Sequence, residues 1–244
     1  MKRVLLLGGT TEATELAAQA TLLEDIEVIS SLAGRTQHPT SLPGTVRVGG
    51  FGGEAGLADY LRAEAIDLLI DATHPFAAQI SHHSAAAAAR CQIPRLMITR
   101  PPWQPEAGDR WVEVVNNAAA AQVLPSIAKR VFLTIGRQDL ATFAPLDLWF
   151  LMRMIDPPSV GTAIPNGLLL QARGPFEVAG EKQLLTDHAI EAIVSKNSGG
   201  EATYAKIIAA REIGVPVVMV QRSPLPPGAQ VATVAEAIAW LRQG

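Results

Sequence analysis

The stretch Val4-Leu5-Leu6-Leu7-Gly8-Gly9-Thr10-Thr11-Glu12-Ala13 decides the fold class of this chain. Its run of large apolar residues predicts a buried strand over 3–8, and the two glycines end that strand. Beyond them, apolar residues recur every three or four positions between Ala13 and Leu23, which predicts a helix with one apolar face. A buried strand, a glycine turn and an amphipathic helix in this order are typical of a βαβ unit.

The same alternation of short apolar runs and helical spacing continues along the chain. Strands are predicted at 3–8, 26–31, 46–49, 67–72, 95–99, 111–115, 131–135, 148–154, 190–195 and 216–220. Further helices are predicted at 54–65, 76–91, 117–128, 176–187, 201–213 and 233–242. The strands are continuous apolar runs, as expected when both faces of a parallel sheet are covered.

Two domains are indicated by a break and by a repeat. The prolines in Arg100-Pro101-Pro102-Trp103-Gln104-Pro105 interrupt the pattern, so we place a boundary there, with domains at 1–100 and 101–244. Ala65-Ile66-Asp67 in the first half is echoed by Ala189-Ile190-Glu191 in the second. We therefore expect an α/β protein of two Rossmann-like domains, with mainly parallel sheets facing an interdomain cleft. One large doubly wound sheet is the alternative, and a strand near the boundary could join the other domain's sheet.

The amino-acid composition of the chain limits the kinds of binding partner that we expect. The 244 residues carry a net charge of −3, are 48% hydrophobic and 18% charged, and include one cysteine. This balance predicts an ordered globular protein and gives no electrostatic reason to expect nucleic acid or an anionic membrane. The apolar run at 4–7 is shorter than a secretory signal requires, and a lone cysteine fits a reducing compartment. We expect a cytoplasmic protein.

Ligands of open parallel sheets bind beyond the carboxyl ends of the strands, which directs attention to the loops there. The loop Gly8-Gly9-Thr10-Thr11-Glu12 has glycines and hydroxyls at the start of a helix, a pattern that favours a nucleotide phosphate. An ordinary tight turn with Thr10 as the helix cap is the alternative. The next loop, Ser31-Leu32-Ala33-Gly34-Arg35-Thr36, contains Arg35, and no acidic residue stands between Ser30 and Thr45, so a dinucleotide bound here should be NADP. A solvated surface arginine is the alternative.

The loops after the third and fourth strands are less specific. Gly52 belongs to the glycine-rich segment 49–53, which brings backbone close to a ligand or to a packed helix. Thr73 and His74 follow the fourth strand, where the nicotinamide end of a dinucleotide lies, and His74 is either an acid of the site or a satisfied loop histidine. His82 and His83 are adjacent on a predicted helix and point apart, so we predict no metal site.

Three cationic side chains lie at the ends of predicted strands in the second half of the chain. Arg137, Arg173 and Lys196 each accompany glycine in a loop, and together they would bind an anion with several carboxylates. Three unrelated surface cations are the alternative. The sequence lacks a phosphate-binding P-loop and a serine nucleophile elbow, and the spacing of Tyr204 and Lys206 differs from the Tyr-x-x-x-Lys of short-chain dehydrogenases.

Taken in order, several motifs resemble the precorrin-6A reductase family of cobalamin biosynthesis. They are Gly8-Gly9-Thr10-Thr11-Glu12-Ala13, Ser31-Leu32-Ala33-Gly34-Arg35, Gly50-Phe51-Gly52-Gly53, Asp71-Ala72-Thr73-His74-Pro75-Phe76-Ala77, Gly174-Pro175-Phe176 and Lys196-Asn197-Ser198-Gly199-Gly200. The similarity extends from Val4 to about Arg222. It implies an NADPH-dependent reductase that saturates one ring double bond of precorrin-6A or cobalt-precorrin-6A, a polycarboxylate tetrapyrrole, to give the 6B form. The cofactor would bind the N-terminal domain and the substrate the interdomain cleft.

These lines of reasoning give a set of expected site residues. His74, Lys196 or water supplies the proton, so His74 and Lys196 are the catalytic candidates. The cofactor-binding candidates are Gly8, Gly9, Thr10, Thr11, Glu12, Ser31, Gly34, Arg35, Gly52 and Thr73, and the substrate-binding candidates are Arg137, Arg173, Lys196, Asn197, Ser198 and Gly199. Two other functions compete: a two-domain NADP-binding sensor without chemistry, and a short-chain-type reductase of a small carbonyl compound, which the missing Tyr–Lys pair disfavours.

Overall fold

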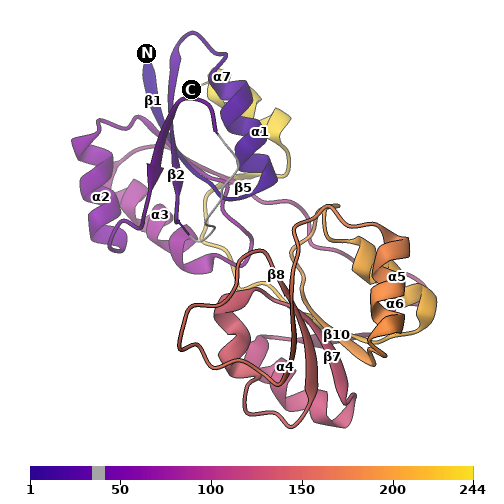
Figure 1. Ribbon diagram of the computed structural model, residues 1–244. Coiled ribbons are helices and arrows are strands. Elements are labelled where there is room, and N and C mark those ends of the chain that lie inside the picture. Colours follow the sequence, from indigo (N-terminus) through magenta and orange to yellow (C-terminus); the bar gives the residue numbers. More distant parts are fainter. Residues whose placement is uncertain (35–41, 244) are drawn as a thin grey trace. The chain divides into compact units, whose positions relative to one another are not determined.

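The computed structural model describes residues 1–34 and 42–243, so Arg35 lies outside the described residues. The chain divides into two compact units, one formed by Met1–Pro101 with Ser223–Gly244 and one by Pro102–Arg222. Each unit contains one six-stranded sheet flanked by helices (Figure 1). All strand pairs are parallel. The prediction of two α/β domains with parallel sheets is confirmed, and the single large sheet is excluded.

The first unit is a doubly wound sheet. Its strands are β1 (Lys2–Leu7), β2 (Ile26–Leu32), β3 (Thr45–Val48), β4 (Leu68–Asp71), β5 (Arg95–Ile98) and β12 (Ala229–Val231), and its helices are α1 (Thr11–Ala20), α2 (Glu54–Ala63), α3 (Ala78–Cys91) and α7 (Val234–Gln243). The strand order is β12-β5-β4-β1-β2-β3. The winding direction therefore changes between β1 and β4, and the loops that follow these two strands lie side by side at the carboxyl edge of the sheet.

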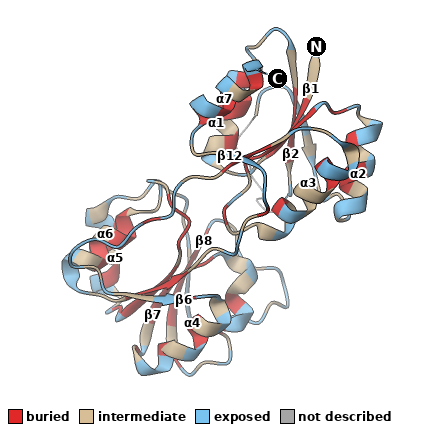
Figure 2. Cartoon of the chain, turned by 180° about the vertical axis from the view of Figure 1, so that it is seen from behind, coloured by how far each residue is buried: buried red, intermediate tan, exposed pale blue. Residues whose placement is uncertain are grey.

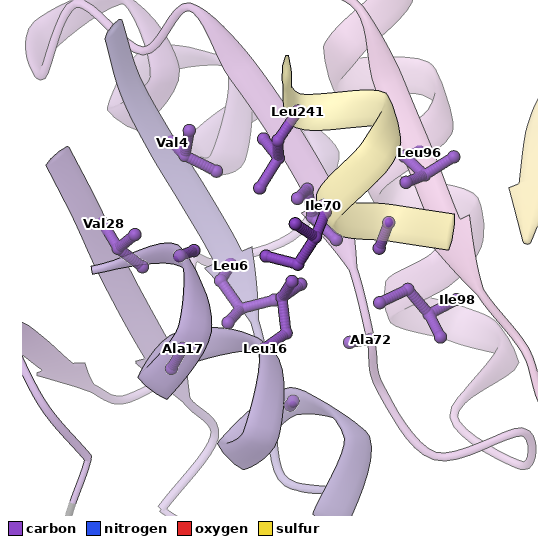
Figure 3. Packing of buried hydrophobic residues seen from close by; sticks show 14 of the residues in the cluster. Val4, Leu6, Leu16, Ala17, Val28, Ile70, Ala72, Leu96, Ile98 and Leu241 are labelled. Carbon is purple, nitrogen blue, oxygen red and sulfur yellow. The ribbon is translucent and has the colours of Figure 1, made fainter. Parts of the chain in front are cut away.

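Strand β1 shows why both faces of this sheet must be covered. Successive side chains of a strand point to opposite faces, and all four residues from Val4 to Leu7 are buried. Val4 and Leu6 pack in one cluster with Leu16 of α1 and Leu241 of α7 (Figure 3). Their neighbours in β1 belong to a separate cluster with α2 and α3 on the other face. A strand of this kind has no polar face, as its continuous apolar run predicts.

The second unit has the same plan. Its strands are β6 (Trp111–Val114), β7 (Arg130–Thr134), β8 (Trp149–Met154), β9 (Gly167–Gln171), β10 (Ala192–Lys196) and β11 (Val217–Val220). Its helices are α4 (Asn117–Val123), α5 (Val178–Asp187) and α6 (Ala205–Ile213), with the 3₁₀-helices η1 (Leu124–Ser126) and η2 (Arg137–Thr142). The order is β6-β11-β10-β7-β8-β9. Figure 2 shows the buried residues concentrated in the central strands and on the inner sides of the helices.

The two units exchange their sixth strands. After β5 the chain leaves the first unit, and β6 becomes the strand beside β11 in the second sheet. After β11 it returns, and β12 pairs with β5. The expected second domain of 101–244 is therefore wrong at its end, because Ser223–Gly244 belongs to the first unit. The physical reason is that α7 buries Val234, Ala237 and Leu241 against the first sheet.

The part of the chain that the structure describes contains neither a membrane-spanning helix nor a cluster of metal ligands. Among residues 1–34 and 42–243, no helix is long and apolar enough to cross a membrane; α3, at 14 residues, is the longest of those listed above. Within the same ranges, no group of three or more His, Cys, Asp or Glu side chains is arranged to hold a metal ion.

Candidate functional site

The loop after β1 is tied to both neighbouring strand ends. Gly8 donates its N–H to the carbonyl of Ser31 at 2.9 Å, which joins this loop to the end of β2. Thr10 caps α1, because its Oγ1 accepts the N–H of Ala13 at 3.1 Å. The same hydroxyl donates to the carbonyl of Ala72 at 2.8 Å and so bridges the loops after β1 and β4. Thr10 therefore has the structural role of a helix cap at the point where the winding direction changes.

Gly9 provides the close approach that an anion needs. Its φ is +113°, a left-handed conformation that favours glycine. A Cβ built on Gly9 would meet no heavy atom of the described residues within 4 Å, so this side of the loop is open. The first backbone N–H groups of a helix have no partner inside the helix, and Thr10 satisfies that of Ala13. The remaining donors at the start of α1 and the open glycine fit a phosphate group.

Glu12 lies in the first turn of α1, beside that phosphate position, and Arg100 neutralises it. Arg100 Nη1 contacts both carboxylate oxygens, at 2.9 and 3.0 Å. Burial by itself would raise the pKa of Glu12, but the hydrogen bond and charge of Arg100 and the bonds from the backbone and Thr10 hold it below its usual value. The pair lines a small pocket with Thr10, Thr73, Pro75 and Ile98. A carboxylate can therefore stand here without repelling an anionic ligand.

Thr73 is held by a buried polar network below the loop after β4. Asp71, which is 1% exposed, accepts hydrogen bonds from the N–H of Thr73 at 3.1 Å and from its hydroxyl at 2.7 Å. The other oxygen of Asp71 accepts from Ser84 at 3.2 Å and lies 3.8 Å from Arg95. Burial lowers the pKa of Arg95, which its attraction to Asp71 partly offsets. These bonds fix the direction of the loop that carries His74.

His74 is exposed, and its ring is oriented by its own loop. Nδ1 accepts the N–H of Phe76 at 3.2 Å, and the two rings lie 6.0 Å apart at a tilt of 42°. With Nδ1 as an acceptor, the proton of a neutral imidazole is on Nε2. His74 thus presents Nε2 as the donor at the carboxyl edge of the first sheet.

The remaining candidates of the first unit lie at the end of β2 or after β2 and β3. Gly34 and Gly52 have φ values of +71° and +78°, so glycine is the favoured residue at both positions. Ser31 is 5% exposed, and its hydroxyl lies 3.2 Å from Nη1 of Arg47, a residue that the sequence analysis did not select. Arg35 follows Gly34 and lies outside the described residues.

In the second unit the winding direction changes between β7 and β10, and a salt bridge spans the loops there. Lys196 Nζ lies 2.6 Å from Oδ2 of Asp139. Arg137, at the start of η2, donates to the carbonyl of Pro157 at 3.0 Å. It lines an open, polar pocket of about 300 Å³ together with Gln138, Ser159 and Thr162. Arg173 is exposed in the loop after β9. All three cations expected from the sequence therefore lie at or after the carboxyl ends of strands of this sheet, since Lys196 ends β10, Arg137 follows β7 and Arg173 follows β9.

Asn197, which the sequence predicts to bind substrate, has both ends of its side-chain amide bonded to the backbone of Trp103. Its side-chain oxygen accepts the N–H of Trp103 at 2.8 Å, and its side-chain nitrogen donates to the carbonyl of Trp103 at 3.1 Å. Trp103 Nε1 in turn donates to the carbonyl of Gly200 at 3.0 Å. Asn197 therefore clamps the segment by which the chain enters this unit. Its neighbours Ser198, which is 8% exposed, and Gly199, at φ +66°, complete the turn.

A buried cluster of charges in this unit also escaped the sequence analysis. Arg153 and Glu181 form an ion pair whose side chains are 7% and 2% exposed. Lys206 donates to the carbonyl of Thr203 at 2.7 Å and lies 4.9 Å from the ring of Trp103. Burial, followed by repulsion from Arg153, lowers the pKa of Lys206 to about 7, against the attraction of Glu181. The only signal in the sequence is a set of charges at inward-facing positions of strand and helix.

These features define a two-domain, doubly wound α/β protein whose first unit has a glycine loop that opens a helix at its change of winding. Comparison with known proteins gives the family. The family described as "Precorrin-6x reductase CbiJ/CobK" matches residues 3–242. The chain belongs to this family.

Curated relatives and a solved structure agree with this membership. The chain is 51% identical to the precorrin-6A reductase of Rhodococcus erythropolis over 99% of this chain and 98% of that protein. It is 45% identical to the precorrin-6A reductase of Rhodobacter capsulatus over 99% of this chain and 96% of the relative. The solved structure described as "CobK precorrin-6A reductase" is 43% identical, with a TM-score of 0.92, and the match covers 100% of this chain and 97% of that one.

Proposed function

We propose that this protein reduces precorrin-6A with NADPH as the hydride donor. The observation that carries the proposal is the match to precorrin-6A reductases over nearly the whole chain, at 51% identity for the Rhodococcus relative. The loop from Gly8 to Glu12 supports a phosphate-bearing cofactor, because it combines an open, left-handed glycine with the start of a ten-residue helix.

NADPH supplies a hydride when it is bound. The residues that would bind and orient it are those of the loop after β1, for the pyrophosphate, and Thr73 and His74 after β4, for the nicotinamide. Asp71 fixes Thr73, and Arg100 neutralises Glu12, so contacts within the chain hold both loops in place. Hydride transfer is mainly a matter of positioning, which loops held by such contacts favour.

The substrate is a tetrapyrrole with carboxylate arms, and we assign the cations of the second unit to those arms. Arg137, Arg173 and Lys196 lie at or after the carboxyl ends of strands of one sheet, and Asp139 orients the ammonium of Lys196. Arginine binds a carboxylate through two N–H groups, whereas lysine acts as a point charge. The proton that completes the reduction comes from His74, Lys196 or water.

We further propose that the substrate is the metal-free precorrin. The two precorrin-6A reductases named above are 51% and 45% identical to this chain. By contrast, the cobalt-precorrin-6A reductase of Priestia megaterium is 26% identical over 96% of each chain. Closer similarity to the first group favours the metal-free macrocycle.

A turnover assay tests both proposals. Purified protein is mixed with NADPH and either metal-free or cobalt-containing precorrin-6A, and the nicotinamide absorbance and the product mass are followed. We expect NADPH oxidation and a product with two more hydrogen atoms, faster with the metal-free substrate. Binding of NADPH and precorrin without oxidation would instead identify a sensor, and equal rates would remove the preference for the metal-free macrocycle.

A further inference from the structure

Arg47 lies on β3, next to the loop after β2, and it is fixed at this position by three hydrogen bonds. Nη1 donates to the carbonyl of Gly49 at 2.5 Å and to the hydroxyl of Ser31 at 3.2 Å. Nη2 donates to the carbonyl of Gly50 at 2.7 Å. These bonds join the ends of β2 and β3 at the carboxyl edge of the first sheet.

Two aromatic rings restrict the guanidinium further. Its central carbon lies 3.8 Å from the ring centre of Phe51 and 5.1 Å from that of Tyr60. The two rings contact each other edge to face, with centroids 5.2 Å apart. An arginine held between carbonyls and rings loses little side-chain entropy when it binds a further group, so Arg47 is preorganised.

The charge of Arg47 is not neutralised by the described residues. The oxygens that it contacts belong to two carbonyls and a hydroxyl, all uncharged. None of the ion pairs within residues 1–34 and 42–243 includes Arg47, whereas Arg3, Arg62, Arg95 and Arg100 of the same unit each pair with a carboxylate. In that part of the chain its Nε–H and one N–H of Nη2 have no hydrogen-bond partner. Donors on these adjacent nitrogens match two oxygens of a phosphate.

We propose that Arg47, together with Ser31, binds the 2′-phosphate of the adenosine ribose and so selects NADPH over NADH. This inference rests on the proposed function. The end of the second strand is where a doubly wound fold meets that ribose, and an arginine there accommodates a 2′-phosphate.

The competing explanation is that Arg47 only holds the glycine loop 49–53 in place. A ratio of affinities separates the two roles, because loss of the loop affects both dinucleotides whereas loss of the phosphate contact affects NADPH alone. Binding of NADPH and NADH is therefore measured by calorimetry for the wild-type protein, Arg47→Met and Arg47→Lys. Arg62→Met is the matched control, because Arg62 is an exposed arginine of the same unit that pairs with Asp59.

We expect Arg47→Met to weaken NADPH binding about 10- to 100-fold and NADH binding by less than about threefold. Arg47→Lys keeps the charge without the fork and should retain part of the preference, and it also serves if the methionine variant does not fold. Arg62→Met should change neither affinity. Equal loss for both dinucleotides, or no loss for either, would overturn the assignment of Arg47. Failure of the wild-type protein to bind NADPH at all would instead refute the proposed cofactor.

Discussion

The buried Lys206 allows a quantitative test of how a buried charge affects the folding stability of the second unit. It is 3% exposed and lies on α6 within a cluster that includes Arg153, Glu181 and Trp103. Burial and the like charge of Arg153 lower its pKa from 10.5 to about 7, while Glu181 partly offsets them. Below that pKa the folded protein must keep a charged amine in a dry environment. We therefore expect Lys206→Met to increase stability relative to wild type most at low pH.

The size of the effect follows from linkage between protonation and folding. The unfolded chain binds a proton at Lys206 up to a higher pH than the folded chain does, so the stability of the wild-type protein rises with pH between the two pKa values. At about 1.4 kcal/mol per pKa unit, burial of Lys206 costs about 5 kcal/mol near pH 6, where the amine is charged in the folded chain, and about 1–2 kcal/mol near pH 9.5, where it is neutral there. Loss of the bond to Thr203 adds a term that does not depend on pH. The difference between variant and wild type should thus shrink by about 3 kcal/mol over this range.

Urea unfolding at a series of pH values measures this difference. Lys182→Met is the control, because Lys182 is an exposed lysine of α5 that pairs with Glu212, and its effect should stay nearly constant with pH. A difference for Lys206→Met that stays constant between about pH 6 and pH 9.5 would show that the amine is not desolvated as the structure indicates.

Three further outcomes are expected. Asn197→Ala should lower stability by about 2–4 kcal/mol, because it leaves both backbone groups of Trp103 unsatisfied; an unchanged unfolding midpoint would contradict the clamp. Truncation after Arg222 should unfold the first unit, since it removes β12 and α7; retained amide protection in that unit would refute this. Lys196→Ala should mainly raise KM if the ammonium binds a carboxylate, whereas a fall in kcat of about 10²–10⁴ at constant KM would identify the proton donor.

The internal repeat shows how far the sequence alone predicts this fold. Ala65 and Ala189, which open the two echoed segments, have φ values of +47° and +48°. Each is followed by an isoleucine whose N–H bonds back to a leucine of the preceding helix, at 2.9 Å in both cases. A left-handed alanine is unusual, so its presence at both places indicates one shared helix-to-strand connection. The apolar runs and this repeat were enough to predict ten of the strands listed above.

Two strands were missed, for different reasons. β9 is an edge strand whose Leu168 and Leu169 are exposed by 46% and 37%, so its apolar run does not reflect burial on both faces. β12 has the short sequence Ala-Gln-Val and is placed by its pairing with β5 and by α7 behind it. The spacing of apolar residues and their hydrophobicity indicate only local burial. They do not report which of two similar sheets a sixth strand joins, and the exchange was left open for that reason.

The candidate site, like the fold, could be predicted from the sequence only in part. Glycine turns after apolar runs could be predicted, because position after a strand and backbone conformation are local properties. The partners could not, since Arg100 reaches Glu12 across 88 positions and Asn197 reaches Trp103 across 94. Whether a polar residue of such a loop is available to a ligand depends on these contacts. The side-chain amide of Asn197 is bonded to Trp103, whereas Arg47 keeps two N–H groups without a partner among the described residues. The spacing of residues in the sequence predicts neither.

The two units have equivalent strand orders, but they differ in the helix that follows the loop at the change of winding. In the first, the loop opens a ten-residue helix, whose aligned peptide dipoles and first N–H groups favour a phosphate. In the second, the corresponding loop opens η2, a 3₁₀-helix of six residues, and a lysine–aspartate pair spans the strand ends. So short a helix offers little dipole, and any anion bound there must be held by side-chain cations such as Arg137 and Lys196. Backbone donors suit a pyrophosphate of fixed geometry, whereas long cationic side chains can follow carboxylates on flexible arms. We therefore propose that the first unit binds the cofactor and the second the tetrapyrrole.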